Sequence, residues 1–273
     1  MRPGRLRRLR RMRRARRLPR RGVLLLPSLF TVANIFCGFS AIIQAANGKY
    51  VLAAGLIVVA SILDGLDGRV ARITGGTSEF GLQFDSIADT VSFGVAPAYV
   101  MYIWALQPLH RLGWAASFLY VICAAARLAR FNMQHAVSDN RYFIGLPTPP
   151  AAVALSGVVL FFQIPIADMR VSGAAGGLLA VMSLLMVSRM RYRSFKDLVL
   201  PPRRPYLAII GMAAVLVVVV IEPALFVLVV GFIYVLSGPL ALAGRRWRRR
   251  AGASRSPKPA GVADATQTAL PES

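Results

Sequence analysis

Four aspartates lie in two closely spaced pairs. Asp64 and Asp67 are three residues apart, and Asp85 and Asp89 are four residues apart. On helices, either spacing puts both carboxylates on one face. Four carboxylates that meet cannot all stay ionised without positive charge among them, from arginines or from metal. Because Mg²⁺, Mn²⁺ and Ca²⁺ prefer oxygen ligands, the pattern favours a divalent-metal site with room for two ions that bridge a diphosphate.

The segment that joins the two pairs must bring them together. The glycine-containing connection over residues 73–84 would let the two helices run antiparallel, so that all four carboxylates meet at one depth. Gly68 and Gly81 would let a bulky nucleotide approach the helix backbones, where a side chain would block it. The alternative is that the aspartates are solvated helix ends paired with Arg69 and Arg72. Four aspartates at these spacings, with small residues between them, favour the functional interpretation.

The composition indicates a membrane protein. Of the 273 residues, 56% are hydrophobic and only 16% are charged, whereas a soluble domain has about a quarter of its residues charged. The first 21 residues hold twelve arginines, and a second arginine cluster occupies residues 245–250. Between these ends the chain consists of long apolar runs, which is typical of a polytopic membrane protein.

The apolar runs predict an all-α bundle of about eight transmembrane helices. A spanning helix needs about 20 apolar residues. The predicted spans are residues 23–46, 50–68, 86–107, 112–132, 149–166, 171–188, 206–221 and 223–242. We expect residues 1–22 to form a disordered basic arm, residues 201–243 a C-terminal transmembrane hairpin, and residues 244–273 a basic and then disordered tail.

Basic residues also predict the orientation. If the N-terminus is cytoplasmic, the outer loops contain only Lys49, Arg111 and Arg170, and the other loop arginines face the cytoplasm. Both termini and the aspartates are then cytoplasmic. The net charge of +22 would suit nucleic acid or anionic lipid; the adjacent apolar spans favour lipid. The first span continues through Asn34, Cys37 and Gln44 without a signal-peptide cleavage site, so we expect a retained helix.

The order of the aspartates and small residues resembles a known signature. Asp64-x2-Asp67-Gly68-x2-Ala71-Arg72-x8-Gly81-x3-Asp85-x3-Asp89 matches that of the CDP-alcohol phosphatidyltransferase family at all eight fixed residues over 26 positions. The resemblance implies a six-helix catalytic core, here within residues 23–200, a cytoplasm-facing site, divalent metal (Mg²⁺ or Mn²⁺, two ions) and a homodimer. It also implies that all four aspartates hold metal and that Asp89 is the general base. The residues implied to line the CDP-lipid site are Gly68, Ala71, Arg72 and Gly81.

Further segments narrow the resemblance to the membrane-bound phosphatidylserine synthases of bacteria and archaea. These segments are Leu26-Pro27-Ser28-Leu29-Phe30-Thr31-Val32-Ala33-Asn34, Ala88-Asp89-Thr90-Val91-Ser92-Phe93-Gly94-Val95-Ala96-Pro97, Arg127-Leu128-Ala129-Arg130-Phe131-Asn132 and Gly145-Leu146-Pro147-Thr148-Pro149. The resemblance implies a CDP-diacylglycerol–serine O-phosphatidyltransferase, an enzyme that makes phosphatidylserine and CMP.

The acceptor site is less defined by sequence. Arg127 and Arg130 share a helix face and could bind the serine carboxylate or the lipid phosphate, although interfacial snorkelling is the alternative. Asn34, Asn132 and Ser92 are further predicted polar contacts, and a helix-packing hydrogen bond is the alternative for Asn34. A sister enzyme that uses glycerol phosphate, inositol phosphate or choline remains open. A divalent-cation carrier or channel also remains open, although it would favour acidic residues at the membrane midplane.

Overall fold

The computed structural model describes residues 25–74, 79–135, 142–193 and 205–253. The predicted basic arm and the end of the tail lie outside the described residues. Each of the eight predicted spans is helical over most of its described residues. The elements are α2 (Leu25–Ala46), α3 (Tyr50–Thr74), α4 (Glu79–Asp89), η1 (Thr90–Val95), α5 (Ala96–Met101), η2 (Tyr102–Leu106), η3 (Gln107–Leu109), α6 (Arg111–His135), α7 (Thr148–Phe162), α8 (Met169–Val187), α9 (Pro205–Ile221) and α10 (Pro223–Ala253).

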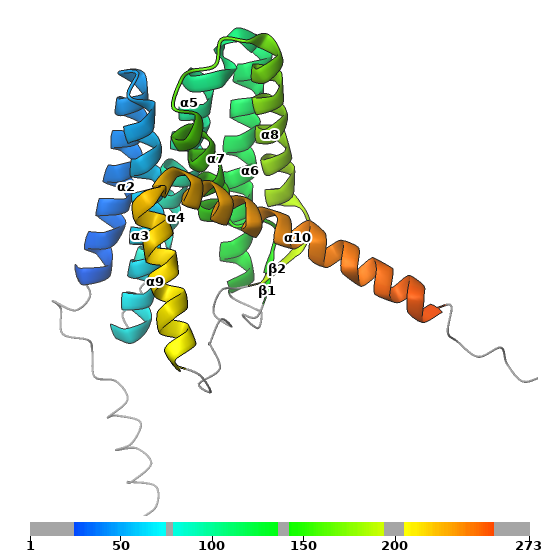
Figure 1. Ribbon diagram of the computed structural model, residues 1–273. Coiled ribbons are helices and arrows are strands. Elements are labelled where there is room, and N and C mark those ends of the chain that lie inside the picture. The colour runs from blue at the N-terminus through cyan, green and yellow to red at the C-terminus, as the bar shows by residue number, and fades with distance from the viewer. Residues whose placement is uncertain (1–24, 75–78, 136–141, 194–204, 254–273) are drawn as a thin grey trace, which may run out of the picture.

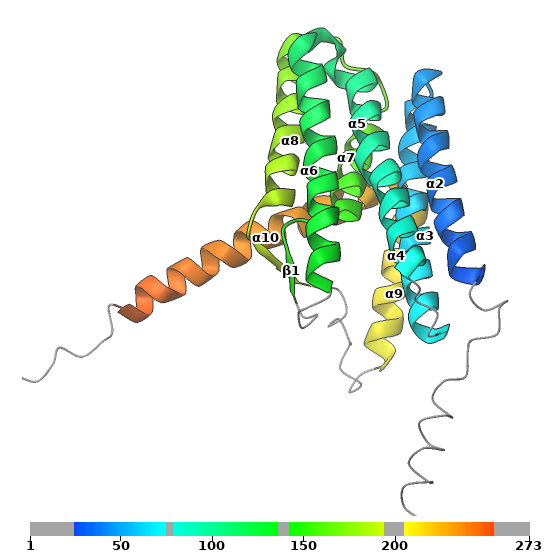
Figure 2. The ribbon, with the colours of Figure 1, turned by 180° about the vertical axis from the view of Figure 1, so that it is seen from behind.

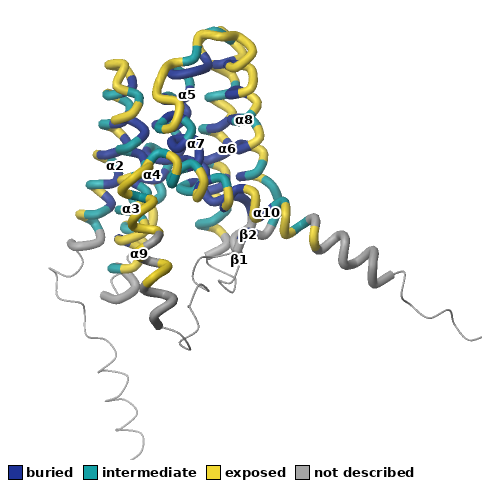
Figure 3. The backbone as a smooth tube through the Cα atoms, in the orientation of Figure 1, coloured by how far each residue is buried: buried dark blue, intermediate teal, exposed yellow. Residues whose placement is uncertain are grey.

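The helices form a polytopic membrane bundle, as predicted (Figure 1). Five of the described helices are long and apolar enough to cross a membrane: Ser28–Ala46, Tyr50–Val70, Arg111–Met133, Met169–Val187 and Pro223–Leu242. Many of their large apolar side chains are exposed, such as Phe36 and Leu184. Figure 3 shows exposed positions recurring along these helices. Such surfaces suit lipid rather than water. The remaining predicted spans are the shorter apolar helix α7, the segment from α4 to η3, and α9.

The third predicted span is not a regular α-helix. After α4 the chain forms a π-helical turn over Thr90–Val95 and a second one over Tyr102–Leu106. Pro97, in the first turn of α5, has no amide N–H to continue a regular hydrogen-bond ladder. π-Turns occur frequently at functional sites. Asp89 therefore lies at the joint between an α-helix and a π-turn.

A tight turn sets the relation of α2 to α3. Gly48 has φ of 74°, a left-handed conformation that favours glycine, and its N–H donates to the carbonyl of Ala45 over 3.0 Å. The turn reverses the chain, so α2 and α3 pack as antiparallel neighbours (Figure 1). Residues equally far from this turn then lie at the same depth. Because both helices rise by about 1.5 Å per residue, Thr31 of α2 lies near the depth of Asp64 and Asp67 of α3.

A short β-ribbon was not predicted from the sequence. β1 (Tyr142–Ile144) and β2 (Arg191–Arg193) pair antiparallel, with Phe143 opposite Tyr192. The ribbon joins the chain before α7 to the chain after α8. Gly145, with φ of 84°, follows β1, and Pro147 then caps the start of α7. The prolines after it occupy the first turn, where their missing N–H groups cost no helix bond.

The last two helices meet at Glu222. α9 ends at Ile221 and α10 begins at Pro223. Figures 1 and 2 show α10 crossing the bundle obliquely, and it packs against α7. The predicted division into a core and a C-terminal hairpin stays a prediction.

Candidate active site

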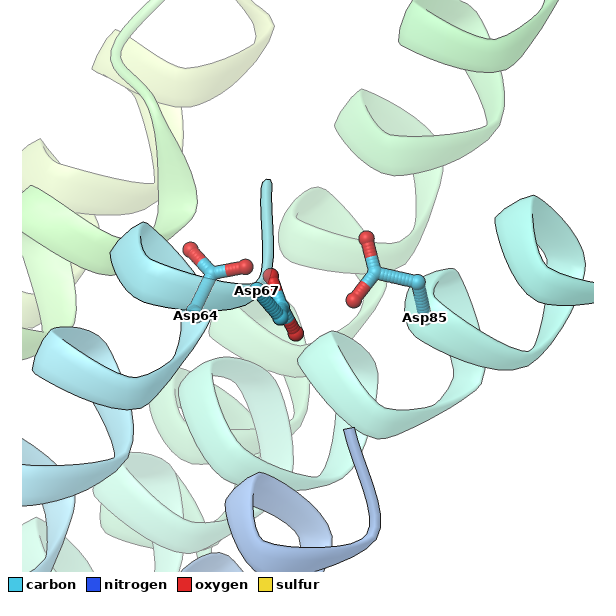
Figure 4. Close-up of side chains that lie close together, drawn as sticks. All are labelled: Asp64, Asp67 and Asp85. Atoms are coloured by element: carbon cyan, nitrogen blue, oxygen red, sulfur yellow. The ribbon is translucent and has the colours of Figure 1, made fainter. Parts of the chain in front are cut away.

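Three of the four predicted aspartates meet between α3 and α4. Asp64 and Asp67 project from α3, and Asp85 projects toward them from α4 (Figure 4). One carboxylate oxygen of each lies within 4.8 Å of the others. Asp67 is buried, with 5% of its surface exposed. The spacing of three residues puts Asp64 and Asp67 on one side of α3, where they face Asp85 of α4. The sequence predicts that Asp89 joins them as a fourth member.

The donor set suits a divalent cation. Oδ1 of Asp85 is buried and has no hydrogen-bond partner among the described residues. A buried carboxylate oxygen without a partner is costly unless a cation or another ligand satisfies it. Three close carboxylates also repel one another. Mg²⁺ and Mn²⁺ accept such oxygen ligands and complete their shells with water and phosphate, so the residues present fit the metal that the sequence predicts.

Asp89 stands one turn beyond Asp85 on α4 and differs from the other three. It is 8% exposed, and its Oδ1 accepts a hydrogen bond from Nδ2 of Asn34 over 3.3 Å. It interacts electrostatically with Asp64, Asp85 and Asp67, although it is not a member of the close group of three. A metal-binding role for Asp89 stays a prediction.

Helix α2 forms the wall of the site that faces the aspartates. Thr31 Oγ1 donates to Asp67 Oδ2 over 3.4 Å, and Asn34 reaches Asp89 as described. Ser92 Oγ donates to the backbone carbonyl of Asn34 over 2.9 Å. Gly38 permits this contact, because a Cβ there would lie 2.6 Å from the Cα of Ser92. Ser92 therefore fixes α2, and Thr31, which the sequence analysis did not single out, joins the site.

The two predicted arginines have different surroundings. Arg127 on α6 is 8% exposed, and one of its terminal nitrogens donates to Thr148 Oγ1 on α7 over 2.9 Å. Its guanidinium interacts electrostatically with Asp89 and Asp64. Arg130 instead donates to the carbonyl of Val187 over 3.3 Å at the end of α8. The structure thus brings Arg127 to the aspartates. Thr148 carried no sequence signal beyond its place in the Gly145–Pro149 segment.

The remaining predicted site residues are Asn132, Gly68, Gly81, Ala71 and Arg72, and their surroundings differ. Asn132 Nδ2 donates to Ser86 Oγ over 2.9 Å, which ties α6 to α4. Gly68 follows Asp67 and borders open space, since a Cβ there would meet nothing within 4 Å. Gly81 lies on α4, two turns before Asp89. The side chains of Ala71 and Arg72 lie outside the described residues.

Comparison with known proteins agrees with the site. The family model described as CDP-alcohol phosphatidyltransferase matches residues 24–188, which include all four aspartates, both arginines and the π-turns. This chain belongs to the CDP-alcohol phosphatidyltransferase family. It is therefore a transferase, and residues 24–188 of this phosphatidyltransferase carry the features that define the family. The helices α9 and α10 follow the matched region.

Curated relatives of this phosphatidyltransferase carry a common name. A Helicobacter pylori protein named CDP-diacylglycerol--serine O-phosphatidyltransferase is 43% identical over 180 residues, which cover 66% of this chain and 76% of the relative. A Mycobacterium leprae protein of the same name is 34% identical over 84% of this chain and 78% of its own length. One from Methanocaldococcus jannaschii is 32% identical over 80% of this chain and 94% of its own length.

Proposed function

We propose that this phosphatidyltransferase transfers the phosphatidyl group of CDP-diacylglycerol to L-serine, giving phosphatidylserine and CMP. The observation that carries the proposal is the meeting of three carboxylates beside the buried Asp89. The names of the relatives from three distant organisms support serine as the acceptor. The buried Arg127 beside the base also suits an acceptor that carries a carboxylate.

The aspartate group would bind the diphosphate of the donor, CDP-diacylglycerol, through the metal ions. Asp64, Asp67 and Asp85 would hold Mg²⁺ or Mn²⁺, as two ions, which when bound neutralise the diphosphate and stabilise CMP as the leaving group. The open space at Gly68 leaves room for the nucleotide beside the α3 backbone.

Asp89 is the general base of the proposed reaction. Its carboxylate takes the proton from the serine hydroxyl, and the serine oxygen attacks the lipid-side phosphorus. The bond from that phosphorus to the CMP oxygen breaks, and CMP leaves with the electron pair. The hydrogen bond from Asn34 fixes one oxygen of Asp89 and so orients the other for the acceptor. Arg127 then binds the serine carboxylate, because a guanidinium donates two hydrogen bonds to a carboxylate in fixed geometry.

The proposed enzyme acts at the cytoplasmic surface of the membrane. The bias of basic residues supports an inner-membrane protein with both termini and the aspartates on the cytoplasmic side. The arginine-rich ends would bind anionic lipid, and the working form would be a homodimer. The aspartates lie toward one end of α3, which suits a reaction at the membrane surface, with the acyl chains left in the bilayer.

CMP release by the purified protein tests the proposal. The protein in detergent is supplied with CDP-diacylglycerol, Mn²⁺ or Mg²⁺, and separately with serine, glycerol 3-phosphate, inositol 1-phosphate or choline. Release that requires serine and stops on addition of EDTA is the expected result. Release with another acceptor alone would overturn the serine assignment and leave the family chemistry intact. No release with any acceptor from folded protein would overturn the proposed reaction and favour a carrier or channel.

A further inference from the structure

Helix α10 lies outside the region that defines the family, yet it reaches the site. The family match ends at residue 188, and α10 begins at Pro223. α10 is held against α7 by two glycine contacts. A Cβ on Gly231 would lie 2.7 Å from the Cα of Ala154, and a Cβ on Gly157 would lie 2.7 Å from the Cα of Leu228. Such close backbone approach through glycine fixes the register of two membrane helices.

This register places Tyr234 of α10 in the interior beside Arg127. Tyr234 is only 8% exposed. Gly231 meets Ala154 and Leu228 meets Gly157, so α10 and α7 run antiparallel and Tyr234 lies along α7 toward Thr148, to which the Arg127 guanidinium donates. The same guanidinium interacts with Asp89 and Asp64 and bonds to Thr148. Tyr234 therefore lies near the arginine of the proposed acceptor site, and that arginine interacts in turn with the aspartates.

A second aromatic ring holds the ring of Tyr234 in place. Tyr192 of β2 stacks on it with the ring centroids 5.8 Å apart and the planes 26° from parallel. The hydroxyl of Tyr192 donates to the carbonyl of Val235 over 3.3 Å. Gly238 makes room for this second ring, since a Cβ there would overlap it. The β-ribbon thus fixes the position of Tyr234 on α10.

The charge balance limits what this pocket can bind. Among the side chains whose burial the structure describes, Arg127 is the basic one that is buried. One guanidinium and one neutral phenol match a single carboxylate, because both groups donate hydrogen bonds. An ammonium group at the phenol would be repelled by Arg127.

We propose that Tyr234 determines acceptor specificity: its hydroxyl donates to the acceptor carboxylate that Arg127 binds, so that α10 selects an amino acid over an amino alcohol. This inference rests on the proposed function and adds a residue outside the family region to the site. Ethanolamine has the reacting hydroxyl and the ammonium group of serine but no carboxylate. The Tyr234 hydroxyl therefore stabilises bound serine and makes no contact with bound ethanolamine.

The test compares Tyr234→Phe with the wild-type protein, using serine and ethanolamine as acceptors in the CMP-release assay. Tyr102→Phe is the matched control, because Tyr102 is a partly buried tyrosine of η2, thirteen residues beyond Asp89 on the same helical segment. Loss of a hydrogen bond to a charged group weakens binding by about tenfold or more. We therefore expect Tyr234→Phe to raise the KM for serine by about that factor, and to lower the serine-to-ethanolamine ratio of kcat/KM by the same factor.

The KM for CDP-diacylglycerol, the ethanolamine kinetics and the melting temperature should stay within about twofold or a few degrees of wild type. Tyr102→Phe should match wild type throughout. An unchanged serine KM in folded Tyr234→Phe would overturn the inference, and so would an equal loss with both acceptors, which would indicate a structural role. Failure of the wild-type protein to use serine would instead overturn the proposed function, which keeps the two results distinct.

Discussion

Asn34 on α2 donates a hydrogen bond from Nδ2 to Oδ1 of Asp89 over 3.3 Å, across 55 residues of sequence. Asn34 is fully buried, and its backbone carbonyl accepts from Ser92 three residues beyond Asp89. Its own Oδ1 has no hydrogen-bond partner among the described residues. The side-chain amide of Asn34 therefore donates its N–H to the proposed base. This contact makes Asn34 a positioning residue for Asp89.

Replacement of Asn34 by alanine should slow the reaction without preventing folding. Asp89 would lose the donor that fixes its orientation, and a hydrogen bond to a charged group contributes about 1.5–3 kcal/mol. We expect kcat for CMP release to fall by about tenfold or more, with the KM for CDP-diacylglycerol within about twofold of wild type. Gln44→Ala removes an amide from the same helix near its other end and is the control. Equal kinetics in Asn34→Ala and Gln44→Ala would contradict the positioning role.

Asp89→Asn separates the proposed base from the proposed metal ligands. The amide keeps the size of the carboxylate and can still pair with Asn34 after rotation, but it cannot take a proton. General-base catalysis contributes about 10²–10⁴-fold, so kcat should fall by at least about a hundredfold. The variant should still fold and still gain thermal stability from Mn²⁺. Near-normal turnover would refute the assignment of Asp89 as the base.

Asp85→Asn should abolish stabilisation by metal. A ligand that binds only the folded state raises the melting temperature as its concentration exceeds Kd, and the three-carboxylate group needs Asp85 to close it. Melting temperatures are measured in detergent with Mn²⁺ or with EDTA. We expect the Mn²⁺-dependent rise to vanish in Asp85→Asn and to persist in Glu79→Gln, which changes an exposed acid on the same helix. A normal Mn²⁺ response from Asp85→Asn would argue against the metal centre.

Gly38→Ala tests the packing of α2 on the site. The new Cβ would lie 2.6 Å from the Cα of Ser92, which forces the two helices apart. Overpacking costs about 1–3 kcal/mol, so the melting temperature and the activity should both fall. Gly55→Ala is the control, because a Cβ there meets nothing within 4 Å and alanine is the better helix former. Equal melting temperatures for the two variants would contradict this prediction, because α2 could then move away from Ser92 at no cost in stability.

The sequence was sufficient for the helices and for the close approach of Asp64, Asp67 and Asp85. Apolar runs of spanning length predict helices wherever they occur, and each of the eight predicted segments is helical over most of its described residues. Spacings of three and four residues put Asp64 with Asp67 and Asp85 with Asp89, because the helix period is a local property. The likeness of these residues to a family signature then indicated a phosphatidyltransferase, which the family match confirms.

The contacts between distant segments depended on the tertiary structure. No local pattern could assign Asn34 to Asp89, distinguish Arg127 from Arg130, or bring Tyr234 to the site, because these relations follow from how whole helices pack. The β-ribbon and the π-turns were missed for the same reason: three-residue strands and single wide turns carry almost no periodic signal. Helix formation is decided within one segment by its own residues, whereas the surroundings of a side chain are decided by the segments that pack against it.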